Sequence, residues 1–276
     1  MALGLVASWL VGSWLTQPAG LSPGHIPPGD FRLASADGVS LAASYRPGPT
    51  ESSPAVLLLH QKGASRQAMA GRAAWLNRAG YATLAIDLRG HGQSTATPYS
   101  FGWRESRDAA AAFRWLKRRQ RGAAVAIFGV SLGGAAALLG DGPLPADALI
   151  LQCVYADIRS AARNRIAWVA GDAPAWLLEP LLSYQSRLRI GVWPDAISPR
   201  ARLAHFPGPV LVIGGAGDRY VLPAETRSLY QTAAGPKRLW WIAQGGHAAA
   251  AGHDDPAYRA AILAFLRASL PVRSAG

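Results

Sequence analysis

Short segments that are apolar at almost every position recur along the chain, and segments of helical pattern separate most of them. The first is AVLLL at residues 55–59, and the second is ATLAI at residues 82–86. Further apolar segments cover residues 123–128, 148–153, 210–213 and 239–243. A strand that is apolar on both faces needs cover on both faces, which is typical of parallel sheets with helical crossovers. The pattern therefore predicts an α/β fold on a mostly parallel sheet.

Two further strands and a set of helices complete the expected core. Phe31–Ser35 and Val39–Tyr45 flank Asp37-Gly38, a hairpin turn signal, so these two strands bring the sheet to eight. Periodicity predicts helices over residues 65–79, 103–119, 132–139, 224–234 and 256–270. We therefore expect an eight-stranded sheet with helices on both faces.

One connection is too long to be a plain loop. Residues 154–207 contain no clear strand, yet they carry Trp168, Trp176 and several leucines. Connections of this length are uncommon in compact domains unless they have structure of their own. We predict a small helical cap over 154–207, inserted between a first core part at 31–153 and a second at 208–276.

The N-terminal segment, residues 1–30, has a different character. MALGLVASWLVGSWL is apolar to Leu15, a Pro/Gly-rich link follows, and the first basic residue is Arg32. Three interpretations remain open: a signal or anchor without its usual basic flank, an interfacial helix using Trp9 and Trp14, or a helix packed on the domain. The first two favour an exported or membrane-associated protein, with membrane association through residues 1–15, over a cytoplasmic one.

Composition excludes several classes of protein. The 276 residues carry a formal charge of +12, but the basic residues are spread along the chain, so we expect no nucleic-acid partner. The dense run KRRQR at residues 117–121 falls at the end of a predicted helix, where cations suit the helix dipole. A single cysteine, Cys153, excludes an internal disulfide framework. Neither a metal-ligand spacing nor a dinucleotide-binding glycine fingerprint is present, so we expect no metal and no cofactor.

Polar residues that could carry chemistry follow the apolar strands. In open parallel sheets, ligands bind at the carboxyl ends of the strands. His60 and Asp87 follow early strands, Ser131 follows VAIFGV, Asp218 follows VLVIGGAG, and His247 follows LWWIAQGG. A serine, an acid and a histidine are therefore expected at one edge of the sheet, where a histidine can activate a serine hydroxyl.

Several motifs in this order resemble the α/β-hydrolase superfamily, in its esterase, lipase and serine aminopeptidase branch, from about residue 31 to residue 270. They are HQKG at 60–63, DLRGHGQS at 87–94, GVSLGG at 129–134, GAGDRYV at 215–221 and GGH at 245–247. The resemblance implies a Ser131–His247–Asp218 triad, with Ser131 on a strained G-x-S-x-G turn. It also implies an oxyanion hole from the backbone amides of Leu132 and Lys62, whose own side chain is expected to face solvent.

Some assignments have rivals. Asp157 could replace Asp218, and His253 could replace His247. Among candidate pocket residues are two tryptophans of the predicted cap, Trp168 and Trp176, and two residues of the first loop, His60 and Gln61. His60 and His91 are expected to shape the floor of the site. Gln61 stands where relatives usually carry glycine. If this position needs a positive φ, the glutamine side chain would strain the backbone.

The function expected from these features is that of a serine hydrolase cleaving an ester or related acyl bond through an acyl-enzyme, on a small and partly apolar acyl substrate. Thioesterase, aminopeptidase-like and acyltransferase activities use the same triad and remain alternatives. A non-catalytic, membrane-associated binding protein is the alternative from another class.

Overall fold

The structure, a computed structural model, describes residues 2–22 and 24–270, so residues 1, 23 and 271–276 of the predicted segments lie outside the described residues. Its eight strands run in the order β1-β2-β4-β3-β5-β6-β7-β8. They are β1 (Asp30–Ala34), β2 (Ser40–Arg46), β3 (Ala55–Leu59), β4 (Ala82–Ile86), β5 (Val125–Val130), β6 (Ala148–Gln152), β7 (Val210–Gly215) and β8 (Lys237–Ile242). Only the β1–β2 and β2–β4 pairings are antiparallel, which confirms the predicted mostly parallel sheet.

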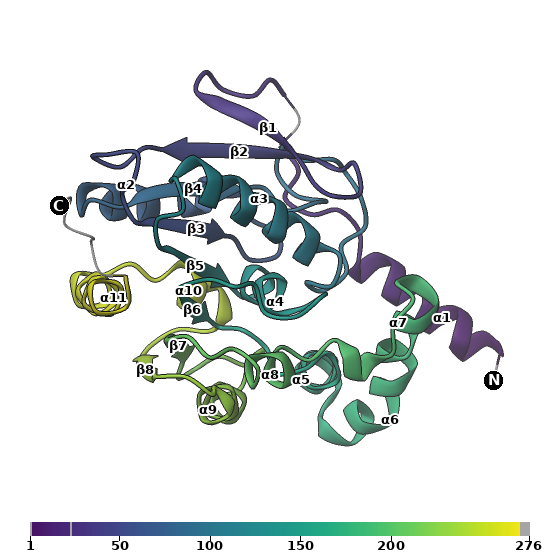
Figure 1. The fold of residues 1–276 in the computed structure, drawn as a ribbon. Helices are drawn as coiled ribbons and strands as arrows, with labels where there is room; N and C mark the ends of the chain where they lie inside the picture. Colours follow the sequence, from purple (N-terminus) through teal and green to yellow (C-terminus); the bar gives the residue numbers. More distant parts are fainter. Residues whose placement is uncertain (1, 23, 271–276) are drawn as a thin grey trace.

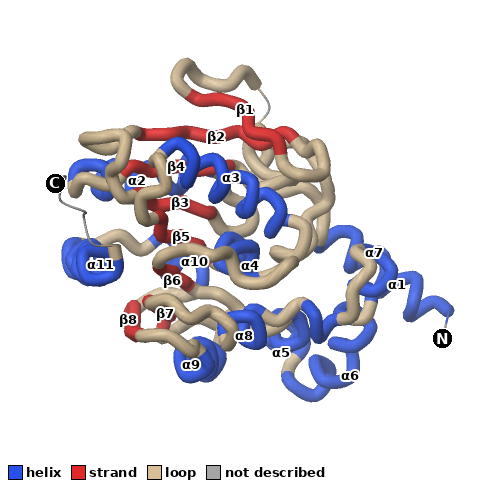
Figure 2. The backbone as a smooth tube through the Cα atoms, viewed as in Figure 1, coloured by secondary structure: helices blue, strands red, loops and turns tan. Residues whose placement is uncertain are grey.

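Helices cover both faces of this sheet (Figures 1 and 2). The helices of the core are α2 (Ala70–Arg78), α3 (Glu105–Arg119), α4 (Leu132–Leu138), α9 (Pro223–Thr232), α10 (His247–Gly252) and α11 (Pro256–Ser269). Side chains of alternate direction on one strand enter different cores: Leu57 belongs to the core that includes residues of α3, α4 and α9. Leu58 belongs to the core that includes residues of α2, α10 and α11. The strands are apolar throughout because each must fill two cores.

Parallel pairing brings the strand ends to one edge. Leu59 at the end of β3 is paired with Gly129 of β5, and Gly129 is paired with Leu151 of β6. Gln152 at the end of β6 is paired with Ile213 of β7. The loops that leave β3, β5, β6 and β7 therefore start side by side.

Element ends differ from the expected ones where loops carry their own hydrogen bonds. The helix predicted from residue 103 begins at Glu105, because the Glu105 carboxylate accepts hydrogen bonds from the amides of Ser100 and Gly102. The helix predicted over residues 65–79 opens as a 3-10 turn, η1 (Arg66–Met69), capped by the Ser65 side chain. The short helix α10 was not anticipated, since HAAAAG follows a strand with no cap signal of its own.

The connection between β6 and β7 is helical. It contains α5 (Ile158–Ala170), α6 (Asp172–Ser183), α7 (Gln185–Arg189), the 3-10 turn η2 (Pro194–Ala196) and α8 (Pro199–Leu203). The helices α5 and α6 pack against each other, and Figure 1 shows α5, α6 and α7 beside the carboxyl edge of the sheet.

The apolar N-terminal segment forms helix α1 (Ala2–Leu15), which lies beside α6 and α7 (Figure 1). Arg189 donates a hydrogen bond to the Trp9 carbonyl at 2.6 Å, and its guanidinium stacks 3.8 Å from the centre of the Trp9 ring. Gln185 donates to the Ser8 carbonyl at 2.9 Å. Of the three interpretations of this segment, packing on the domain describes its position. Among the described residues, none of the helices combines the length and apolar character needed to cross a bilayer.

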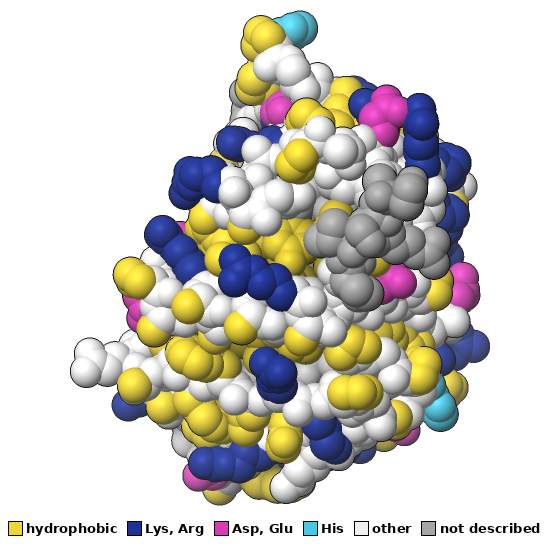
Figure 3. Space-filling view, turned by 60° about the vertical axis from the view of Figure 1, so that its left-hand side comes forward, with side chains coloured by type: hydrophobic (Ala, Val, Ile, Leu, Met, Phe, Trp, Pro, Cys, Tyr) yellow, Lys and Arg dark blue, Asp and Glu magenta, His cyan; other side chains and the backbone are white. Residues whose placement is uncertain are grey.

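Basic side chains are dispersed over the surface. Figure 3 shows Lys and Arg scattered across one face between apolar groups, without a continuous basic stripe on that face. On this face, the positive charge is therefore dispersed rather than concentrated.

We expect Gly12→Ala to weaken the docking of α1. An added Cβ at Gly12 would lie 2.1 Å from Gln185 Oε1, so the Gln185 side chain must move and lose its bond to the Ser8 carbonyl. A lost hydrogen bond of this kind costs about 0.5–1.5 kcal/mol. The rate of proteolytic cleavage in the link at residues 16–30 should rise, and the melting temperature should fall by a few degrees.

Gly4→Ala in the same helix is the matched control, because nothing lies within 4 Å of a Cβ there. Both substitutions raise the intrinsic helix propensity equally. Equal cleavage rates in the two variants would contradict the packing described for Gly12.

Candidate active site

Ser131 lies on a strained turn between β5 and α4. Its φ is 49° and its ψ is −110°, a conformation that side-chain-bearing residues rarely adopt and that costs of order 1–3 kcal/mol. The turn is tight enough to require glycine on both sides. A Cβ on Gly129 would lie 2.4 Å from Gly134 Cα, and a Cβ on Gly133 would lie 2.4 Å from the Leu59 carbonyl oxygen. The two glycines of G-x-S-x-G therefore allow the backbone contacts that hold Ser131 at the sheet edge.

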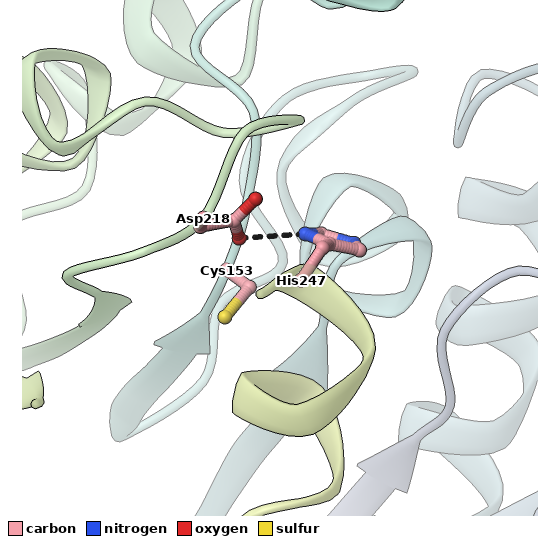
Figure 4. Close-up of side chains that lie close together, drawn as sticks. All are labelled: Cys153, Asp218 and His247. Atoms are coloured by element: carbon pink, nitrogen blue, oxygen red, sulfur yellow. Dashed lines mark hydrogen bonds and ion pairs between the residues drawn. The ribbon is translucent and has the colours of Figure 1, made fainter. Parts of the chain in front are cut away.

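Ser131, His247 and Asp218 form a continuous hydrogen-bonded series. Ser131 Oγ lies 3.2 Å from His247 Nε2, and His247 Nδ1 lies 2.7 Å from Asp218 Oδ2. The other oxygen of Asp218 accepts hydrogen bonds from the amides of Tyr220 and Val221, each at 2.9 Å. Asp218 is 2% exposed, so these bonds fix its carboxylate toward the imidazole (Figure 4).

The two rivals have other partners. Asp157 caps α5 by accepting a hydrogen bond from the Ser160 amide at 2.8 Å. His253 lies at the end of α10, and its Nε2 pairs with Asp255 at 2.8 Å. The structure therefore brings Asp218 and His247, and neither rival, to Ser131.

Cys153 lies beside the Asp218–His247 pair (Figure 4). One ligand atom from each of these three residues lies within 4.8 Å of the others, and no other such group occurs in the described part of the chain. Burial, with the neighbouring Asp218 charge, raises the pKa of the Cys153 thiol. Cysteine binds a metal ion as the thiolate, and a raised pKa keeps the Cys153 thiol protonated. His247 Nδ1 is already bonded to Asp218, so these three residues suit an Asp–His pair better than a metal ion.

The loop after β3 rests on buried histidines. His60 Nδ1 lies 2.7 Å from the Gln61 carbonyl oxygen, and its Nε2 accepts a hydrogen bond from the Leu88 amide at 3.0 Å. Burial lowers the pKa of His60 to about 3, so the ring is neutral, and burial also lowers the pKa of His91. Gln61 is absent from the residues of positive φ in the described chain, so its side chain does not strain the backbone.

Lys62 is exposed, as expected, but its side chain also has partners in the protein. Its ammonium lies 4.9 Å from the centre of the Tyr99 ring and donates to the Leu15 carbonyl at 3.3 Å. Burial, and the charge of Arg165, lower its pKa. Leu132 is the first residue of α4, where a helix leaves its first amides without intrahelical partners.

A cavity of about 560 Å³ opens beside Ser131. Its walls come from α1, from the loop at residues 98–104 and from the helices between β6 and β7. Of the candidate pocket residues, Trp168 lines this cavity, whereas His60, Gln61 and Trp176 do not. His60 is fully buried under the loop, and Trp176 projects outward at 63% exposure with Arg163 stacked on it.

Several cavity residues escaped the sequence analysis. They are Tyr99, Arg104, Tyr155 and Arg165, together with the α1 residues Val11, Trp14 and Leu15. None belongs to a motif, because each reaches the cavity through tertiary packing of loops and helices. The apolar pattern of α1 was visible in the sequence, but its docking partner was not.

A family model described as serine aminopeptidase, S33, matches residues 50–187, which is half of the chain. The chain belongs to this family. This S33-family chain is also similar to uncharacterized protein YqkD of Bacillus subtilis, at 32% identity over 197 residues that cover 68% of the chain and 62% of YqkD. It therefore spans less than two thirds of that relative. Uncharacterized protein Rv2307c of Mycobacterium tuberculosis is 30% identical over 230 residues, 82% of the chain and 73% of that protein.

Solved structures share the fold. The esterase Pf2001 of Pyrococcus furiosus superposes on the S33-family chain with a TM-score of 0.72 at 20% identity, covering 92% of the chain and 98% of that structure. A hydrolase of Pseudomonas aeruginosa superposes with a TM-score of 0.60 at 22% identity, covering 87% and 98%. Together with the family match, these likenesses confirm the predicted resemblance in fold: the S33-family chain has the α/β-hydrolase fold.

We expect His60 to make stability fall as the pH falls. The folded protein keeps the ring neutral down to about pH 3, whereas the unfolded chain protonates it below its ordinary pKa of 6.5. The contribution is therefore complete above pH 6.5 and is lost toward pH 3, at up to about 1.4 kcal/mol per pH unit. His60→Gln should show a smaller loss of unfolding free energy between pH 6.5 and pH 5 in urea titrations.

His205→Gln, at an exposed position, is the control and should follow the wild-type curve. A His60→Gln profile parallel to wild type would refute this assignment, whatever its stability at neutral pH.

Proposed function

We propose that the protein is a serine hydrolase that cleaves carboxylic esters through an acyl-enzyme. The observation that carries this proposal is the hydrogen-bonded series Ser131–His247–Asp218 at the wall of an apolar cavity. A protein that only bound ligands would gain nothing from a strained serine whose hydroxyl lies 3.2 Å from an imidazole. The family match supports hydrolysis as the reaction class.

In the proposed mechanism His247 Nε2 takes the proton of Ser131 as the hydroxyl oxygen attacks the ester carbonyl. Asp218 keeps the imidazole oriented and stabilises its positive charge. The amides of Lys62 and Leu132 stabilise the oxyanion of the tetrahedral intermediate. His247 then protonates the leaving alcohol, and the same imidazole activates a water molecule that releases the acid.

The cavity supports an ester over a peptide with a free amino terminus. An aminopeptidase must hold a substrate ammonium group, for which a carboxylate is the usual partner. No Asp or Glu is found among the residues that line the cavity, all of which are described, whereas isoleucine, leucine and tryptophan side chains are frequent there. Such a wall suits an alkyl or acyl chain.

We also propose that this hydrolase docks on an anionic bilayer surface through α1 and α6. Apolar side chains are exposed on both helices, which pack together, and they include Leu10 at 63% and Leu177 at 77%. Trp9 and Trp14 are of the type that favours the headgroup region. Arg187 of the neighbouring α7 is exposed and complements anionic lipids. The cavity wall formed by α1 would then face the lipid from which substrate is drawn.

Substitution of the triad should abolish catalysis. We expect Ser131→Ala to remove labelling by a fluorophosphonate probe and to lower kcat on chromogenic esters by a factor of about 10⁴ or more. His247→Ala should be similar, because the serine loses its base. Circular dichroism should show that the variants remain folded.

The rivals of the triad supply matched controls. Asp157→Asn and His253→Gln remove an acid and a histidine from nearby positions and should retain labelling and turnover. Loss of labelling in a control, or unchanged turnover in Ser131→Ala, would refute the proposed assignment.

Charges on the exposed apolar surface should weaken binding to vesicles. A leucine side chain that is buried in the bilayer contributes about 1.5–3 kcal/mol to binding. Leu10→Glu and Leu177→Glu should therefore each lower the partitioning of the protein onto vesicles about tenfold or more. Flotation with vesicles of mixed phosphatidylcholine and phosphatidylglycerol measures this. Leu222→Glu alters an exposed leucine at the start of α9 and should bind as wild type. Equal binding by all variants would refute the proposed surface.

A further inference from the structure

The cavity beside Ser131 has an unusual charge balance. Four cations line it, Lys62, Arg104, Arg165 and Arg189, and no carboxylate does. None of the four forms an ion pair with a carboxylate within residues 2–22 and 24–270. The cavity is therefore positive as well as apolar.

Two buried arginines of the core, Arg66 and Arg89, are neutralised by carboxylates. Arg66 pairs with Asp30 and Asp87, and Arg89 pairs with Asp37 and Asp108. A buried charge without a partner is costly, so such pairing is the ordinary solution. The cations of the cavity differ from these two arginines: Lys62 is exposed, Arg104, Arg165 and Arg189 are half-buried, and none of the four has a carboxylate partner among the described residues.

Two of the four have structural duties. Arg189 donates to the Trp9 carbonyl and to Ser13 Oγ and so fastens α1. Arg104 donates to the Arg189 carbonyl at 3.0 Å. Both guanidiniums hold together backbone segments of the cavity wall. Their hydrogen bonds explain their positions without a bound anion.

Lys62 and Arg165 keep donors to spare. Lys62 uses one donor on the Leu15 carbonyl at 3.3 Å, and Arg165 uses one nitrogen on the Ala161 carbonyl at 3.0 Å. The Arg165 guanidinium lies 4.9 Å from the centre of the Tyr220 ring. That ring packs edge-on against His247 at 5.5 Å, so Arg165 is separated from the triad by one side chain.

We propose that Lys62 and Arg165 bind a carboxylate or phosphate group carried by the ester that Ser131 cleaves. The substrate class is then an anionic amphiphile, with one apolar chain along the wall of α1 and the cap helices. The ammonium and guanidinium repel each other across the cavity, and an anion between them relieves this repulsion while it completes their hydrogen bonds. This inference rests on the proposed function, whose ester bond it characterises further.

The test compares kcat/KM within two pairs of esters whose members differ by one anionic group. The first pair is 1-octanoylglycerol and 1-octanoylglycerol 3-phosphate, with the charge on the alcohol. The second is 4-nitrophenyl octanoate and the 4-nitrophenyl monoester of suberic acid, with the charge on the acyl chain. We expect the 276-residue protein to prefer the anionic member of at least one pair by about tenfold or more, as expected for charge-assisted hydrogen bonds. The pair that shows the preference identifies the side that carries the charge.

Arg165→Gln should bring that preference close to one, and Arg165→Lys should restore part of it. Arg78→Gln removes an equal charge from an exposed position in the last turn of α2 and should keep the wild-type preference. Fluorophosphonate labelling of Ser131 shows that each variant has a formed site.

Failure of this inference is distinguishable from failure of the proposed function. Labelled protein that hydrolyses neutral esters, and prefers the anionic member of neither pair, overturns the inference and leaves the ester hydrolase standing. An unchanged preference in Arg165→Gln also overturns it. Absence of both labelling and turnover overturns the proposed function, and the inference with it.

Discussion

Parallel pairing of the central strands is the constraint on which the site depends. Because β3, β5, β6 and β7 end at neighbouring positions, four loops start along one line at the sheet edge. The turn after β5 has no room to spread: a Cβ on Gly133 would meet the Leu59 carbonyl. Strain at Ser131 is thus held by the same packing that forms the core, and two cores of apolar side chains offset its cost.

Charge is managed in two ways within one fold. In the loop after β4, Asp87 accepts hydrogen bonds from the Arg66 amide and the Gln93 amide and pairs with the Arg66 guanidinium. Such satisfied buried networks fix loop geometry. In the cavity, by contrast, cations face an apolar wall without carboxylates. The first arrangement is complete in the protein alone, and the second gains a partner when an anion enters, which is the physical difference between a structural cluster and a candidate binding site.

The sequence was most informative where chemistry depends on local spacing. Ser131, Asp218 and His247 each follow an apolar strand, so the parallel sheet was enough to bring them together. It was least informative for Trp176 and for His60, which do not line the cavity. The sequence does not indicate whether an aromatic residue of the predicted cap faces the cavity or the solvent. For Trp176, the orientation of α6 as it packs against α5 determines this. Arg165 carried no signal, since an arginine on a helix is ordinarily solvated.

The sequence by itself determined the fold class, the turn at Ser131, and the order in which Ser131, Asp218 and His247 follow their strands. These features can be read from the spacing of apolar residues and glycines and from the order of motifs along the chain. Only the tertiary structure decided the position of α1, the outline of the cavity and its unpaired charges. Those features arise between segments far apart in the chain, such as Gly12 against Gln185 and Lys62 against Leu15. Contacts of that kind follow from how whole elements pack, which no short stretch of sequence encodes.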